Sequence, residues 1–201
     1  MKKIFFIVLA LVAITFLGRT IIQGSKEQTV KAPAAIPKAQ TQTVAPQSPA
    51  IPKGQPTSLS IPALNITADV ESVGMDSEGR MDVPKDDFNV AWYNLGFKPG
   101  AIGSSVIAGH FDARSGGPAI FYKLSTLKSG DEITVSYGNG EKFTFTVTES
   151  ELYDVDDFPL QRVFNTTDKP RLNLITCDGV FDKQSRNYSE RLVVYAELAE
   201  S

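Results

Sequence analysis

The sequence predicts an all-β domain with a few short helices, folded as a closed or partly open β-barrel. Short apolar or alternating runs recur from residue 59 onwards, whereas helical periodicity is scarce. Clusters rich in Gly, Pro, Asn and Asp separate these runs and are typical of turns. Seven or eight short strands over about 140 residues favour a barrel.

Each expected strand is bounded by a turn signal. Gly138-Asn139-Gly140 joins two alternating runs and predicts a hairpin turn, because positive φ suits Asn and Gly. Residues 119–127 are expected to form one or two helical turns. The strand-like runs are Leu59–Ile61, Val70–Val73, Ser105–Ala108, Glu132–Ser136, Lys142–Thr148, Leu172–Thr176 and Leu192–Ala196.

Residues 1–22 predict an amino-terminal transmembrane anchor. Two lysines precede an apolar run, and Ile4–Ile22 spans 19 residues, enough to cross a bilayer if Arg19 extends to the outer interface. The early lysines favour an amino terminus inside the cell. Nothing like an Ala-x-Ala cleavage site follows Leu17, although a cleaved signal peptide remains the alternative.

Residues 23–57 are expected to form a disordered, semi-extended linker. Six of the twelve prolines fall here, among Ala, Gln, Thr and Lys and without aromatic residues. Such a segment cannot bury enough apolar surface to offset the entropy of ordering. It would hold the globular domain, residues 58–201, at a distance from the membrane.

The charge distribution argues against a nucleic-acid partner. Residues 1–57 carry seven basic side chains and one acidic one, a net +6, so the remaining 13 basic and 22 acidic residues give −9. Phosphate binding needs clustered Lys and Arg, which an acidic domain lacks. The basic amino-terminal part suits anionic lipid or wall polymer instead.

The chain has one cysteine and one histidine. An intramolecular disulfide is therefore excluded, and a Cys/His zinc site would lack ligands. We predict neither a metal nor another cofactor. Three loop acids, Asp154, Asp156 and Asp157, raise calcium as an alternative, but such acids are usually just solvated.

Three polar residues stand beside apolar runs that predict strands. Cys177 follows one run, His110 follows another, and Arg191 begins a third. If these strands are neighbours, a thiolate, a proton-donating imidazole and an oxyanion-binding guanidinium can meet. Taken singly, each has a duller interpretation: a core cysteine, a packing histidine and a solvated arginine.

The same residues resemble the sortase family. Leu174-Ile175-Thr176-Cys177, followed 14 residues later by Arg191, is similar to the family's Cys motif and catalytic Arg, and Gly109-His110 matches its histidine. The resemblance covers residues 59–198. Within the family, the sequence is most similar to class F sortases. The segments that carry this similarity are Ala108–Asp112, Gly117–Phe121, Trp92-Tyr93, Pro99-Gly100, Leu127–Asp131 and Ile61-Pro62-Ala63.

The resemblance implies an eight-stranded sortase barrel and a membrane-bound thiol transpeptidase facing the cell exterior. It would cleave an LPXTG-like sorting signal through a Cys177 thioacyl intermediate. The acyl group would then pass to an amine of a peptidoglycan precursor or a pilin, anchoring a surface protein to the cell wall. His110, Cys177 and Arg191 would be catalytic.

Other positions follow from the resemblance with alternatives. Thr176 is expected to shape the oxyanion pocket or, alternatively, only to pack in its strand. Arg186 is a rival for the role of Arg191, and Asp178 is expected to oppose thiolate formation. Phe158, Pro159 and Leu160 would line the groove for the sorting signal, or else serve as packing for the loop that carries them.

Two other functions compete. An L,D-transpeptidase typically has Ser-His/Asn-Gly-Cys at its nucleophile, unlike Leu-Ile-Thr-Cys here, and NlpC/P60-type peptidases place Cys before His. The non-enzymatic alternative is an inactive sortase-like module that binds at the surface. Loss of His, Cys or Arg would favour that alternative, and all three are present.

Overall fold

The structure is a computed structural model and describes residues 51–200. The predicted anchor at residues 1–22 and most of the predicted linker lie outside the described residues. Within residues 51–200, no helix has the length and apolar character needed to cross a membrane.

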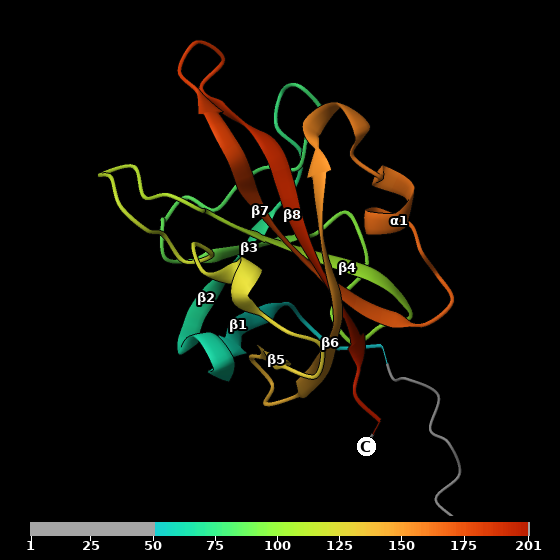
Figure 1. Ribbon diagram of the computed structural model, residues 1–201. Coiled ribbons are helices and arrows are strands. Elements are labelled where there is room, and N and C mark those ends of the chain that lie inside the picture. Colours follow the sequence, from blue (N-terminus) through green and yellow to red (C-terminus); the bar gives the residue numbers. More distant parts are fainter. Residues whose placement is uncertain (1–50, 201) are drawn as a thin grey trace, which may run out of the picture. The chain divides into compact units, whose positions relative to one another are not determined.

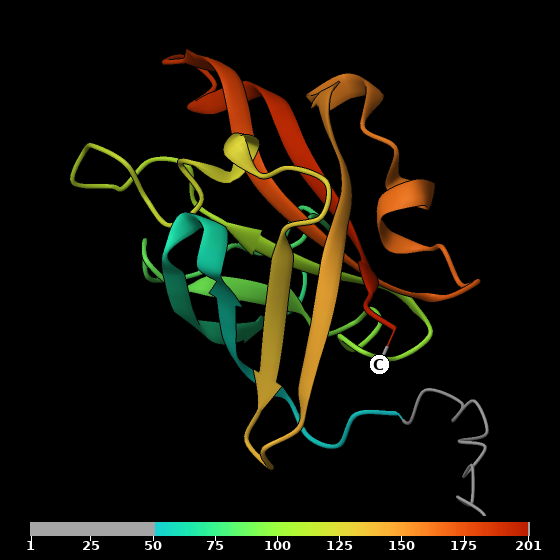
Figure 2. The same cartoon turned by 60° about the horizontal axis from the view of Figure 1, so that its bottom comes forward.

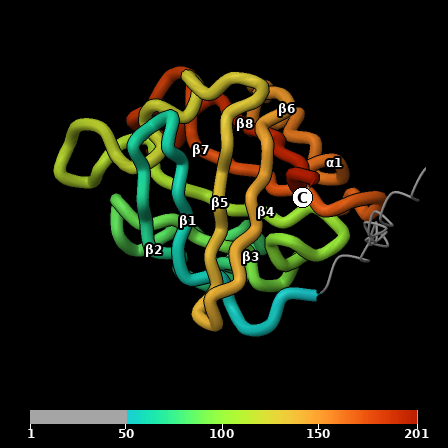
Figure 3. Tube along the Cα trace, turned by 90° about the horizontal axis from the view of Figure 1, so that it is seen from below, coloured from blue at the N-terminus to red at the C-terminus, as the bar shows by residue number. Residues whose placement is uncertain are grey.

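Eight strands close into a barrel in the order β1-β2-β3-β4-β7-β8-β6-β5 (Figure 1). Two of the contacts between neighbours, β2–β3 and β4–β7, are parallel, and the other six are antiparallel. Figure 3 shows β1, β5 and β6 side by side at the closing seam. The strands are β1 (Pro56–Ile61), β2 (Ile66–Val73), β3 (Val90–Tyr93), β4 (Gly103–Gly109), β5 (Glu132–Tyr137), β6 (Lys142–Asp154), β7 (Pro170–Asp182) and β8 (Asn187–Leu198).

The helices are short and lie between strands. Three are single 3₁₀ turns, and the one α-helix of the described residues lies beside β6 (Figure 2). The helices are η1 (Pro62–Leu64), η2 (Leu124–Thr126), η3 (Val155–Asp157) and α1 (Leu160–Phe164).

Alternation along the strands builds the barrel core. In β5, Ile133, Val135 and Tyr137 are buried while the residues between them are more exposed, as a strand with one face in the core requires. Phe121 and Phe145 are the largest fully buried side chains. The β5–β6 hairpin forms where predicted, with Gly140 at φ 88°.

The strands β7 and β8 extend beyond their neighbour β4. The β4–β7 pairing ends at Ala108 and Ile175, whereas β7 and β8 stay paired to Asp182 and Asn187. The two strands therefore project as a hairpin, with its tip at the end of the domain opposite the carboxyl terminus (Figure 1).

Several boundaries differ from the sequence prediction. Pro56 and Thr57, assigned above to the linker, lie in β1, and the four-residue β3 was not predicted as a strand. The strand after Leu172 does not end near Cys177, because β7 continues for five more residues. Likewise β8 begins at Asn187, four residues before Arg191.

Candidate active site

Cys177 and Arg191 face each other across the β7–β8 pair. Their Cα atoms are direct register partners in this antiparallel ladder. Side chains of directly opposed residues lie on the same face of a sheet, with their Cβ atoms about 4.5–5.5 Å apart. The ladder thus puts the only thiol of the chain beside a guanidinium.

This shared face is the outer face of the barrel. Leu174 belongs to the barrel core and Thr176 is buried, whereas Ile175, between them, packs against a second apolar cluster outside the barrel. Cys177 follows the alternation and lies on the side of Ile175. We call this second group the outer-face cluster: Val106, Val163, Val193 and Tyr195, with the partly buried Met81, Tyr93, Tyr153, Phe158, Phe164 and Ile175.

Burial raises the pKa of the Cys177 thiol above its ordinary value. The charge of Arg191 acts in the opposite direction, while the carboxylates of Asp112 and Asp178 raise the pKa further. The expected opposition from Asp178 is therefore present, and Asp112 adds to it. The free protein holds the thiol mostly protonated at neutral pH.

The guanidinium of Arg191 is fixed by the β7–β8 hairpin. One terminal nitrogen donates to Glu190 O at 2.8 Å and to Tyr188 O at 3.2 Å, and the other donates to Asn187 Oδ1 at 2.7 Å. A guanidinium has five N–H donors, so two remain for a ligand. The rival Arg186 lies exposed in the turn after β7, at φ 55°, away from the register position of Cys177.

His110 directly follows β4, as predicted. The Cα partners Ala108 and Ile175 show that β4 and β7 run parallel here, so His110 and Cys177 stand at the same level, two residues beyond that pair. The ring Nε2 of His110 is 2.8 Å from Pro84 O. A carbonyl only accepts, so Nε2 carries a proton and Nδ1 is the acceptor nitrogen of the neutral ring.

Gly109 allows β4 to pass close to the core. A Cβ on Gly109 would lie 2.5 Å from the ring of Phe121, which is fully buried. Phe121 in turn donates its backbone N–H to His110 O at 2.9 Å. The absence of a side chain at residue 109 therefore helps set where His110 stands.

The hydroxyl of Thr176 is used inside the fold. It is buried and donates to Gly109 O at 2.9 Å, tying β7 to the end of β4. Since Thr176 lies on the opposite face from Cys177, this contact supports the strand-packing alternative. The bond joins the strand of the thiol to the residue before His110.

Comparison with known proteins agrees with this arrangement. A sortase domain model matches residues 59–199. The chain belongs to the sortase family. Members of this family are generally cysteine transpeptidases. The match to the sortase family argues against the L,D-transpeptidase and NlpC/P60 alternatives.

Solved sortases of several classes share the fold. They include a lid mutant of sortase A from Corynebacterium diphtheriae, with 19% identity, TM-score 0.57 and 74% of each chain covered. Sortase C-1 from Actinomyces oris has 21% identity, TM-score 0.57 and 72% of each chain covered. Sortase C1 from Streptococcus agalactiae has 25% identity and TM-score 0.55, covering 76% of this chain and 72% of that chain. No curated protein matched the chain.

In this sortase domain, the segment between β6 and β7 covers part of the outer face. Phe158 is half-buried and meets Tyr153 edge to face, with ring centroids 5.9 Å apart. Pro159 precedes α1, and Leu160 is 63% exposed. Phe158 thus packs the segment onto the barrel, while Leu160 is free to meet a ligand. Val163 is fully buried beneath the segment.

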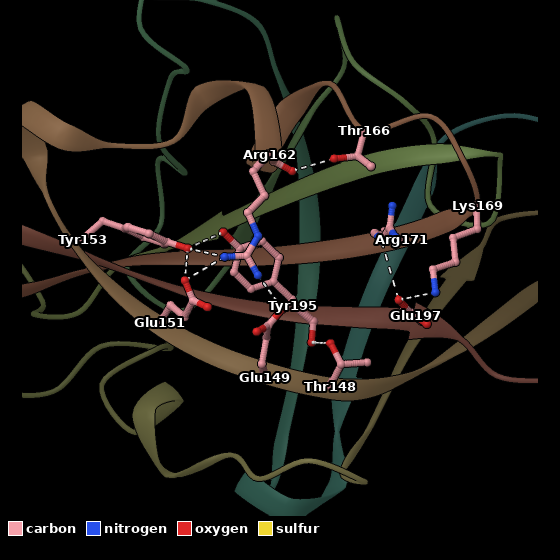
Figure 4. A network of polar contacts seen from close by, with 10 residues as sticks. All are labelled: Thr148, Glu149, Glu151, Tyr153, Arg162, Thr166, Lys169, Arg171, Tyr195 and Glu197. Carbon is pink, nitrogen blue, oxygen red and sulfur yellow. Dashed lines mark hydrogen bonds and ion pairs between the residues drawn. The ribbon is translucent and has the colours of Figure 1, made fainter.

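Arg162 of α1 ties this segment to β6 and β8 (Figure 4). Its guanidinium donates to Glu151 at 2.7 Å, to Tyr153 Oη at 2.8 Å and to Glu149 at 2.5 Å. The guanidinium carbon also lies 4.2 Å from the centre of the Tyr195 ring. We call these five residues the Arg162 network. The sequence does not reveal this network, because its members meet only when β6, β8 and α1 pack together.

The loop after His110 also meets the β7–β8 hairpin. The hydroxyl of Tyr188 donates to the carboxylate of Asp112, and the rings of Tyr188 and Phe111 meet edge to face at 5.7 Å. These contacts connect the segment after His110 with the hairpin that carries Arg191. Nothing in the sequence spacing distinguishes Tyr188 or Asn187 from other hairpin residues.

No group of side chains suited to a metal ion occurs among residues 51–200. Asp154, Asp156 and Asp157 lie in or beside η3, and all three are exposed. They line a surface hollow of about 480 Å³ together with the β7–β8 hairpin.

Proposed function

We propose that this protein is a cysteine transpeptidase that cleaves an LPXTG-like sorting signal and transfers the acyl group to an amine. The proposal rests on the direct pairing of Cys177 with Arg191 in a sortase domain. Among sortases, the motifs around His110 and Trp92 favour class F.

The thiolate of Cys177 attacks the carbonyl carbon of the signal's Thr. The oxyanion that forms accepts hydrogen bonds from the free N–H groups of Arg191, whose positive charge stabilises it. His110 takes the proton of the Cys177 thiol and gives it to the departing amine as the intermediate collapses to a thioester. An acceptor amine then attacks the thioester, and its proton passes through His110 to the sulfur, so that the new amide forms and the thiol is restored.

Because the pKa of the Cys177 thiol is raised, we infer that bound substrate helps to ionise it. Bound peptide would displace water and bring partial positive charges of its own N–H groups to the sulfur, while Arg191 keeps its attraction for the thiolate. Asp112 and Asp178 oppose ionisation in the free protein. The free protein would then hold less thiolate, which is the form that oxidants attack.

The sorting signal would bind on the outer face of the barrel, beside Cys177. Partly buried members of the outer-face cluster, such as Ile175 and Phe158, and the exposed Leu160 offer apolar side chains to the signal. These surfaces suit the signal's Leu and Pro. We further propose that residues 1–22 anchor the chain in the membrane with its catalytic domain outside the cell, and that the amine belongs to a peptidoglycan precursor or a pilin.

Cleavage of fluorogenic LPXTG-variant peptides by the full-length chain, with and without an amine acceptor, tests the proposal. We expect amine-dependent ligation that is abolished in Cys177→Ala. Arg191→Ala should lower the rate by about 10²–10³-fold, the usual cost of an oxyanion donor, while Arg186→Ala should leave it unchanged. Cleavage that persists in Cys177→Ala, or equal losses in the two arginine variants, contradicts the mechanism. No cleavage of any variant peptide would favour the inactive surface module.

A further inference from the structure

The contact of His110 with Pro84 belongs to a longer chain of hydrogen bonds. Pro84 is buried in the segment between β2 and β3, and its carbonyl accepts from Nε2 of His110 at 2.8 Å. The next backbone N–H, that of Lys85, donates to Glu71 Oε2 at 2.9 Å. Glu71 lies in β2, 39 positions before the histidine in the sequence.

The Pro84 carbonyl and the Lys85 N–H belong to one peptide group. That group is planar, and in the trans form its C=O and N–H point in opposite directions. A carboxylate that holds the N–H therefore also fixes the direction of the carbonyl. Negative charge on the N–H side polarises the peptide and makes its oxygen a stronger acceptor.

Glu71 is well held for this purpose. Besides Lys85, its carboxylate accepts the Asp86 N–H at 3.2 Å and the Asn89 side-chain amide at 3.1 Å. Partial desolvation by itself raises the pKa of Glu71, but the hydrogen bonds from Lys85, Asn89 and Asp86 outweigh it and lower the pKa. The group is thus ionised at neutral pH.

The other side of the segment is fixed by Arg114. Its backbone N–H and its Nε donate to Asp87 at 2.9 Å each, and its guanidinium also contacts Lys85 O. The pKa of Asp87 is lowered mainly by its hydrogen bonds from Arg114, and the charge of His110 adds a smaller effect. Residues 84–87 are therefore held from both β2 and the loop after His110.

We propose that Glu71 is a positioning residue for His110, acting through the Pro84–Lys85 peptide group. The carboxylate orients the Pro84 carbonyl, the carbonyl keeps the proton on Nε2, and Nδ1 is left to exchange protons with the reacting groups. The arrangement places one peptide group between a carboxylate and the imidazole. This inference deepens the proposed function, since His110 is the group it positions.

The single histidine of the chain permits a direct test. Full-length protein labelled with ¹⁵N-histidine, and carrying no histidine tag, gives ring signals from His110 alone. For the neutral ring, we expect the Nε2–H tautomer and a slowly exchanging Nε2 proton. In Glu71→Gln we expect a mixed tautomer population and proton exchange about tenfold faster, as for loss of a charge-assisted hydrogen bond.

Asp69→Asn is the matched control. Asp69 is an exposed acid two residues earlier in the same strand, so the variant removes the same charge from the same face. It should leave the ring signals unchanged. Glu71→Asp, which keeps the charge but shortens the side chain, should lose part of the effect and serves if Glu71→Gln does not fold.

Ring signals that stay as in wild type in both Glu71 variants overturn the proposal, and so does an equal change in Asp69→Asn. In the peptide assay we expect Glu71→Gln to lower kcat with KM nearly unchanged, whereas a general structural defect would change both. The NMR signals do not depend on turnover. An inactive wild-type protein with the expected signals would therefore refute the proposed function and leave the Glu71 contact standing.

Discussion

Gly109→Ala is the substitution for which the structure gives the clearest expected cost. The new Cβ would lie 2.5 Å from Cδ2 and 2.8 Å from Cγ of Phe121. Ordinary contacts begin at 3.4 Å, so the ring must retreat by about 0.9 Å, the difference from 2.5 Å. Phe121 is fully buried, and close-packed interiors resist such a shift.

The sign of the effect is diagnostic. Gly109 is not at positive φ, and Ala at a compatible position normally stabilises a protein by about 0.4–1 kcal/mol. Overpacking costs about 1–3 kcal/mol, so we expect a net loss of about 1–2 kcal/mol. For a domain of this size, that corresponds to a fall in Tm of roughly 2–8 °C.

Urea and thermal unfolding of the full-length chain measure this loss. Gly138→Ala is the matched control, because the nearest atom to its Cβ is Thr57 Cγ2 at 3.5 Å, an ordinary contact. Adding Phe121→Leu should recover part of the loss, so the double variant should be more stable than the two single effects predict. A Gly109→Ala protein as stable as wild type would refute the argument that Phe121 restricts this strand.

Three further predictions concern the thiol and the segment that covers the outer face. Asp178→Asn should lower the pKa of the Cys177 thiol, and Arg191→Ala should raise it. Compared with wild type, alkylation by iodoacetamide should therefore begin at lower pH in Asp178→Asn and at higher pH in Arg191→Ala. Equal pH profiles in the two variants would contradict the electrostatic account. In Arg162→Lys, the ammonium group cannot donate hydrogen bonds to all partners of the Arg162 network. We expect a free energy of unfolding about 1 kcal/mol lower and faster limited proteolysis within residues 155–169. Unchanged proteolysis would argue against the network. Asn173→Ala removes a 2.6 Å bond to Val163 O and should cost about 1–3 kcal/mol in urea unfolding; no loss would mean that this bond does not hold α1.

The barrel was largely predictable because its signals are local. Alternating runs such as Glu132–Ser136 and the Gly138–Gly140 turn announce strands and a hairpin without reference to the rest of the chain. The β3 strand was missed because four residues, Val90–Tyr93, show too little alternation. The hairpin extension of β7 was missed because Gly179 resembles a strand end, although here it takes φ 83° within a register shift.

The sequence indicated the candidate residues of the site, but not the contacts that hold those residues in place. Cys177 and Arg191 stand out by chain position, and their expected proximity is confirmed by the β7–β8 register. The contacts of His110 could not be foreseen, because Pro84 and Glu71 come from a distant segment that is chosen only by tertiary packing. The same holds for Arg162, whose partners on β6 and β8 carry no local motif.

The most direct test of the central claim is the mass of the acyl-enzyme. Full-length protein mixed with a sorting-signal peptide, without an amine acceptor, is quenched in acid and digested for mass spectrometry. We expect a thioester on Cys177 carrying the peptide up to its Thr, lost on addition of an amine and absent in Cys177→Ala. Peptide cleavage without an adduct on Cys177, or an adduct on another residue, would contradict the account.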